Sequence, residues 1–338
     1  MKRINLNKII ELSEKIGPSL LPNEIVEVKN KVFRLVEERG VGAFPYKNDI
    51  NKIFEFVKKQ CNVLSDVDGE REIDIPFELT SKIDFINNLS IKVKIINSTH
   101  ENTMYNSGSG VTYFNMSDKI INNKIDSIKI ELTCYCYYGY LMERTVYNSL
   151  YHEINHCYDA YNDLKTNGYY KRMKGQIGKS NIKIKDIFND KIDNELFELI
   201  LYRLFSETEF NALVSSVYGD LQGMHSIRQN FQHDIQLTQA YYLWKYIGTY
   251  YKSLFKKIDE NNIERIKYIF NTYNININPY GNSIDAFIKE LIRKTTYLLN
   301  DLIKRIGKTA SLYYDVQEEK PTNKIMKHVD KNTIIKYD

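Results

Sequence analysis

The segment Thr145–Leu164, TVYNSLYHEINHCYDAYNDL, carries the strongest structural pattern in the chain. Apolar residues recur in it at the three- and four-residue spacing that is typical of an amphipathic helix. They are Val146, Leu150, Ile154, Cys157, Tyr158, Tyr161 and Leu164. The opposite face is polar and holds Thr145, Ser149, His152, His156, Asp159 and Asp163. The pattern predicts a helix with one face against a core and both histidines on the other.

Within this helix, His152 and His156 are four residues apart. That spacing puts them one turn apart on the same face, so both imidazoles can reach a single metal ion. Glu153 follows the first histidine, where a glutamate can accept a proton from water at the metal. The H-E-x-x-H pattern therefore predicts a zinc site with two histidine ligands and Glu153 as general base. The alternative is a pair of surface histidines without a metal.

A catalytic zinc needs a third protein ligand. The H-E-x-x-H-x-x-G-x-x-H pattern is not met, because Asp159 stands at its glycine and Asn162 at its last histidine. The ligand must therefore come from another segment. An apolar helix predicted from Asn194 to about Tyr218 offers Glu195, Glu198, Glu207 and Glu209.

The segments HEINHCYDAY (152–161) and SETEFNA (206–212) together resemble the gluzincins, zinc metallopeptidases whose third ligand is a glutamate on a second helix. The nearest likeness is to the catalytic domain of lethal-factor-type toxin proteases, which carry H-E-x-x-H-x-x-D and then E-x-E-F-x-A. Asp159 and Glu207 to Ala212 stand in matching places. The resemblance implies that Glu209 binds zinc and that Tyr202 stabilises the oxyanion. It covers residues 145–215 only, so the family's substrate does not carry over.

Each of these assignments has an alternative. Ser206-Glu-Thr-Glu209 also fits a capping box, in which Glu209 would bond the backbone N–H of Ser206. Glu207 is the second choice of ligand. Asp159 is expected either to hydrogen-bond near a ligand histidine or to be solvated. Tyr202 could instead pack among Phe197, Leu201 and Phe205.

Other reactive residues give weaker patterns. Cys61, Cys134, Cys136 and Cys157 include no Cys-x2-Cys pair, so we expect buried, reduced thiols, with Cys134 and Cys136 on one face of a strand. His225 and His233 are further candidates for a cleft, whereas His100 and His328 support no argument. Gly108-Ser-Gly110 lacks the rest of a nucleotide-binding fingerprint.

Strand patterns are confined to the first half of the chain. Residues 72–79, 89–97, 110–116 and 127–140 alternate or are rich in β-branched and aromatic residues. Helical periodicity precedes them, as at Ile25–Val36, and returns from Arg144 to about residue 310, with a loop at Asn274–Asn282. This order predicts an α+β, zincin-like fold: a small mixed sheet, an active-site helix and a mostly helical C-terminal half.

We divide the chain into four expected regions. They are an N-terminal helical region (1–70), a zincin-like catalytic core (71–218), a helical C-terminal region (219–316) and a flexible tail (317–338). A net charge of +4 over 338 residues is too small to predict nucleic-acid binding. Neither a signal peptide nor a membrane-spanning segment is expected, which favours a cytoplasmic protein or one packaged in a virus particle.

The function predicted from these features is a zinc-dependent peptidase that uses Glu153 as general base on a peptide or protein substrate. Residues 128–137, just before the metal helix, could bind an extended peptide as an added strand. The alternative is a non-catalytic structural or cargo protein, for example of a bacterial virus particle, that assembles through its helical C-terminal region. A hydrolase of another class with the same metal centre is a third possibility.

Overall fold

The computed structural model describes residues 46–64, 68–81, 83, 88–99, 109–116, 125–167, 187–224, 231–273, 275–279 and 281–317. The helix expected at Ile25–Val36 and the tail expected after residue 317 lie outside these residues. A helix, α3 (Lys47–Asn62), comes first among the described elements. Its buried face includes Ile50, Ile53, Phe54, Val57 and Cys61.

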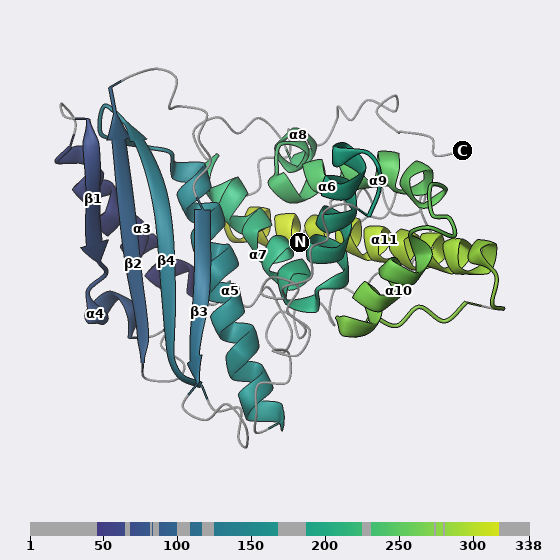
Figure 1. Cartoon of the computed structure of the whole chain (residues 1–338). Helices are drawn as coiled ribbons and strands as arrows, with labels where there is room; N and C mark the ends of the chain where they lie inside the picture. Colours follow the sequence, from purple (N-terminus) through teal and green to yellow (C-terminus); the bar gives the residue numbers. More distant parts are fainter. Residues whose placement is uncertain are drawn as a thin grey trace.

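A five-stranded mixed sheet forms one side of the molecule (Figure 1). Its strands are β1 (Gly69–Asp74), β2 (Leu89–Ser98), β3 (Ser109–Met116), β4 (Ile125–Tyr137) and β5 (Tyr140–Leu141). The order is β1-β2-β4-β3, and the short β5 pairs with the end of β4. β2 and β4 are parallel, whereas β1 is antiparallel to β2 and β3 is antiparallel to β4. Among the described strands, β3 is therefore an edge.

The alternation of residue types decides which face of this sheet is packed. Along β2 every second residue is buried, and in β4 the buried residues include Cys134 and Cys136, which share a face as predicted. This face packs against α3 and α5 (Glu143–Asn167). The other face carries cross-strand ion pairs at 2.6 Å between Lys92 and Glu72 and between Lys94 and Glu70. It is the solvent face.

Two predictions about the sheet are wrong. The strand predicted over residues 72–79 ends at Asp74, and Phe77–Thr80 form the short helix α4. Pro76 lies between them and lacks the N–H that a strand ladder needs, so the strand stops before it. The segment 128–137 does not offer an edge to a peptide, because β4 is hydrogen-bonded to β2 on one side and β3 on the other.

The described residues from Glu143 onward are mostly helical, as predicted (Figure 1). After α5 they form α6 (Lys191–Ile200), the π-helix η4 (Leu201–Phe205), α7 (Glu207–Gly223), α8 (Phe231–Gln236), α9 (Gln239–Phe255), α10 (Ile263–Thr272) and α11 (Ile284–Gln317). Residues 275–279 form the predicted loop between α10 and α11. A search of the described helices finds none long and apolar enough to cross a membrane.

Helices α5 and α7 make the most extensive helix–helix contact in the described structure. Two glycines of α7 allow this close approach. A Cβ added to Gly219 would lie 2.5 Å from the Tyr147 carbonyl oxygen, and one added to Gly223 would overlap the Arg144 backbone. Because the obstructing atoms belong to the backbone, they cannot rotate away. The two helices therefore touch along their main chains at this end.

We predict that Gly219→Ala and Gly223→Ala each destabilise the protein, by about 1–3 kcal/mol or more, through overpacking. The sign of the change in unfolding free energy is informative, because alanine in a helix is otherwise favoured over glycine by about 1 kcal/mol. Gly69→Ala is the matched control, since nothing lies within 4 Å of its added Cβ. The measurement is urea unfolding of the three variants and the wild type. Wild-type or higher stability of both α7 variants would contradict the close contact.

Candidate metal centre

The two histidines of the H-E-x-x-H segment lie on the side of α5 that faces α7. The rings of His152 and His156 are 4.9 Å apart at their centroids and nearly perpendicular. On the opposite side of the helix, the predicted apolar face is confirmed by the buried side chains of Val146, Leu150, Ile154 and Cys157. Tyr158 and Tyr161 are only partly buried. The histidine face is also covered, and His156 is 8% exposed.

The chain reaches this face a second time through a break in its helical path. The helical segment predicted from Asn194 to about Tyr218 is not continuous, because α6 passes into the π-helical turn η4, which ends at Phe205. Ser206 adopts an extended conformation, with φ −83° and ψ 111°, and α7 starts directly after it. π-Helical turns are common next to functional sites. The break separates Tyr202 and Arg203 on η4 from Glu209 on the first turn of α7.

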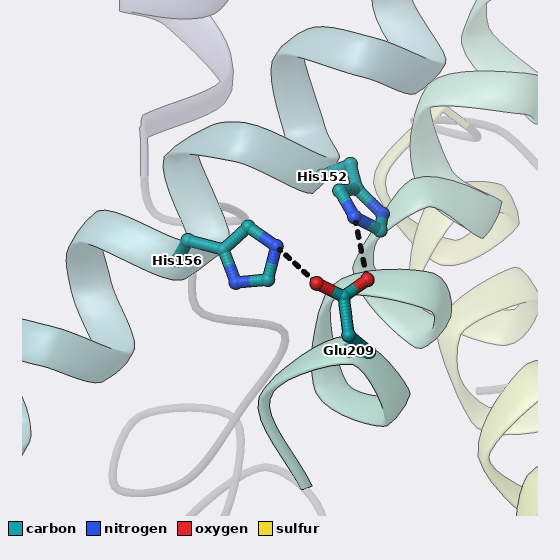
Figure 2. Close-up of side chains that lie close together, drawn as sticks. All are labelled: His152, His156 and Glu209. Atoms are coloured by element: carbon teal, nitrogen blue, oxygen red, sulfur yellow. Dashed lines mark ion pairs between the residues drawn. The ribbon is translucent and has the colours of Figure 1, made fainter. Parts of the chain in front are cut away.

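Glu209 lies between the two histidines (Figure 2). Its Oε2 is 3.4 Å from the His152 Nε2, and its Oε1 is 3.5 Å from the His156 Nε2. The candidate donor atoms of the three residues all lie within 4.8 Å of one another. In a tetrahedral zinc site with bonds of about 2.0–2.2 Å, donor atoms are separated by about 3.3–3.6 Å. The two Glu209–histidine separations lie in this range, and the donor set is one that zinc accepts.

The alternatives for the second helix can be compared with this geometry. Ser206 is the N-cap of α7 but makes no side-chain capping bond, and its Oγ lies 3.2 Å from the Thr208 Oγ1. The Glu209 carboxylate is directed to the histidines and not back to Ser206, so the capping-box alternative is wrong. Glu207 is exposed and lies outside the group of donor atoms.

The charges around Glu209 favour the protonation states that a metal ligand needs. Burial opposes ionisation of Glu209, but its hydrogen bond with His152 and its electrostatic interactions with the two imidazoles and Arg203 outweigh burial and lower its pKa to about 2. Burial, aided by the neighbouring His152, lowers the pKa of His156. At neutral pH the carboxylate is ionised and His156 is neutral, as metal coordination requires.

Glu153, the predicted general base, is 4% exposed. Burial raises its pKa, and the nearby Glu209 adds to this, whereas His156 and a hydrogen bond from Thr112 act in the opposite direction. The Thr112 Oγ1 donates to the Glu153 Oε2 at 2.6 Å. A carboxylate whose pKa is raised from its usual range is better suited to exchange protons near neutral pH.

Tyr202 and Arg203 approach Glu209 from η4. The Arg203 Nη1 donates to the Glu209 Oε2 at 2.9 Å, and its guanidinium carbon lies 4.8 Å from the centre of the Tyr202 ring. Burial raises the pKa of Tyr202, as do the charge of Glu209 and a hydrogen bond to it. The Tyr202 ring packs against the core, and its hydroxyl is near enough to Glu209 for that charge to raise its pKa. The two roles that the sequence left open are compatible.

Asp159 is buried, so the solvated alternative is wrong. It accepts hydrogen bonds at 3.3 Å from the Asn155 Nδ2 within α5 and from the Asn211 Nδ2 of α7, and the second bond links the two helices. His233 lies in α8, where its Nδ1 is 3.5 Å from the Asp234 Oδ1, and it is not part of the metal group. His100, His225 and His328 lie outside the described residues.

All four cysteines are buried and form no disulfide with one another, as predicted.

Thr112, Gly110 and Arg203 have no role that the sequence alone predicts. At Thr112 and Gly110 the only pattern in the sequence was a strand that contains a glycine. A glycine within a strand often marks a close approach of another segment to the backbone. Arg203 had no pattern at all, because its contact with Glu209 depends on the π-helical turn.

No protein-family model, curated protein or solved structure matches the chain. The likeness to gluzincins therefore stays a resemblance of short motifs. The case for a metal centre depends on the ligand types and on their geometry in this structure.

We predict that the protein binds one zinc ion per chain and that Glu209→Gln removes most of it. Affinity should fall more than about 100-fold, because even the loss of a group that hydrogen-bonds a ligand costs about 10–100-fold. Glu207→Gln is the matched control, two residues away and exposed, and should keep wild-type metal content. Elemental analysis after dialysis is the measurement. Metal loss in the control with retention in Glu209→Gln would move the ligand role to Glu207.

Proposed function

We propose that this chain is a zinc-dependent peptidase whose metal ligands are His152, His156 and Glu209. The observation that carries the proposal is the buried Glu153 carboxylate, which directly follows His152, a member of a group whose candidate donor atoms lie within 4.8 Å of one another. A metal site that only stabilises a fold is closed by four protein ligands and needs no general base. Here the described residues supply three ligands, as in catalytic zinc sites.

Glu153 performs the proton transfers in this proposal. A zinc ion in the site would polarise the substrate carbonyl and lower the pKa of a water molecule to about 7. Glu153 accepts the proton of that water as it attacks the peptide carbonyl carbon, and then donates it to the leaving amine.

Tyr202 is the proposed donor to the oxygen that becomes negative during the attack. Its raised pKa keeps the hydroxyl protonated at neutral pH. Its position on η4, one short turn before the helix that carries Glu209, supports this role. A donor directed at a developing oxyanion is among the strongest contributions to catalysis.

The edge strand β3 is the proposed site for an extended peptide. Its neighbour β4 is paired on both sides, whereas β3 is the last described strand of the sheet on the side next to α5. A peptide that adds to β3 would pass the middle of α5, where Glu153 contacts the strand.

We predict that Glu153→Gln abolishes peptide hydrolysis and leaves the fold and zinc content unchanged. Loss of a general base costs at least about 10²–10⁴ in rate, and glutamine has nearly the same shape as glutamate. The assay is digestion of a broad peptide library by zinc-loaded protein, read by mass spectrometry. Equal inertness of wild type and variant on every library would instead favour the non-catalytic structural or cargo alternative.

We also predict that Tyr202→Phe lowers kcat by about 10²–10³ with zinc content unchanged, as the loss of an oxyanion donor does. Tyr242→Phe is the control, because Tyr242 is an exposed tyrosine on α9. Its substitution should leave both kcat and zinc content unchanged. A Tyr202→Phe enzyme with wild-type kcat would leave Tyr202 with its packing role alone.

A further inference from the structure

Two residues of β3 contact the side chain of Glu153. Thr112 donates its hydroxyl to the Glu153 Oε2 at 2.6 Å, while the same hydroxyl is 3.5 Å from the Glu153 backbone oxygen. Gly110 lies two residues earlier, and therefore on the same face of the strand. A Cβ added to Gly110 would lie 2.6 Å from the Glu153 Cγ and 2.7 Å from its Oε1. The strand thus bonds one oxygen of the carboxylate and leaves room for the other.

The two contacts do different things. The short hydrogen bond from Thr112 occupies Oε2. The capacity of the carboxylate to accept another proton or hydrogen bond therefore lies mainly on Oε1. The missing side chain at Gly110 leaves the space in which Oε1 and Cγ lie. Together they restrict Glu153 to a single arrangement in a buried setting, where an unsatisfied carboxylate would be costly.

The general preferences of residue types for strands do not explain why β3 has a glycine at position 110 and a threonine at position 112. Glycine weakens a strand by roughly 0.5–1 kcal/mol relative to alanine, so its presence in β3 needs a local reason. At position 112 valine would suit a strand as well as threonine, but only threonine can donate to a carboxylate. Both residue types are those that the Glu153 side chain requires.

We infer that Thr112 and Gly110 are positioning residues that hold the general base Glu153 in its reactive orientation. The inference depends on the proposed peptidase function and deepens it. Thr112 selects which carboxylate oxygen is engaged, and Gly110 leaves room for the other. Because both lie on the edge strand proposed to receive the peptide, substrate and base are aligned by one element.

The first test compares Thr112→Val with Thr112→Ser in the zinc-loaded, full-length protein. Valine keeps the shape and removes the hydroxyl, so kcat should fall about 10–100-fold, as for other hydrogen bonds that orient a reacting site. KM and zinc content should stay within twofold of wild type, and serine should restore most of kcat. Thr133→Val on the adjacent strand is the control, because Thr133 faces away from Glu153 on the solvent side of β4. A fall in kcat of less than threefold for Thr112→Val would overturn the inference.

The second variant, Gly110→Ala, displaces Glu153 without removing a polar group. It should lower kcat at least as strongly as Thr112→Val and again leave zinc bound, because the three heavy atoms nearest to the added Cβ all belong to Glu153. Wild-type kcat in Gly110→Ala would contradict the close contact with Glu153.

A thermal double-mutant cycle tests the same contact without turnover. Thr112→Val should lower the Tm of the wild type by about 2–4 °C or more, since it removes a hydrogen bond to a charged group. In a Glu153→Met background, which has no acceptor, the same change should have no cost or should raise the Tm. Equal shifts in both backgrounds would overturn the inference. If the wild type is inert on every peptide library, the proposed function fails, and this cycle alone still decides whether Thr112 holds Glu153.

Discussion

The contact between α5 and α7 is the constraint on which the site depends. His152 and His156 are on one helix and Glu209 is on the other, so the group exists only where these helices pack closely. Gly219 and Gly223 let the backbones touch at one end. At the other end the carboxylate of Glu209 lies between the imidazoles. Any side chain at the glycines would separate the helices and hence the ligands.

Buried polar groups hold the two helices in register. At the glycine end, the Arg144 Nε lies 3.1 Å from Asp220 Oδ1, and Asp220 also accepts the backbone N–H of Gln239 at 2.7 Å. Near the candidate ligands, Asp159 accepts from Asn155 and Asn211, and Asn211 accepts from Arg305 on α11. A buried carboxylate without such partners would be strongly destabilising. The paired groups therefore favour one alignment of α5 against α7.

The buried site between α5 and α7 shifts the pKa values of two neighbouring carboxyl groups, Glu209 and Glu153, in opposite directions. Glu209 is in contact with two histidines and Arg203, which lower its pKa to about 2 despite its burial. Glu153 has less positive charge around it, so burial dominates and raises its pKa. One carboxylate remains ionised as a ligand should, and the other is able to exchange a proton. Such separation of pKa values in one site is a common basis for assigning acid–base roles.

Periodicity in the sequence was sufficient to predict α5, the face that carries His152 and His156, the strands β2, β3 and β4, and the shared face of Cys134 and Cys136. These are local properties, because a repeat of 3.6 or 2 residues specifies which side chains share a face. Glu209 was predicted only through a short resemblance, and Thr112, Gly110 and Arg203 were not predicted. Their contacts join segments from 6 to about 43 residues apart. The order of the strands and the break at Ser206 decide those contacts, and both depend on packing between elements, which periodicity does not encode.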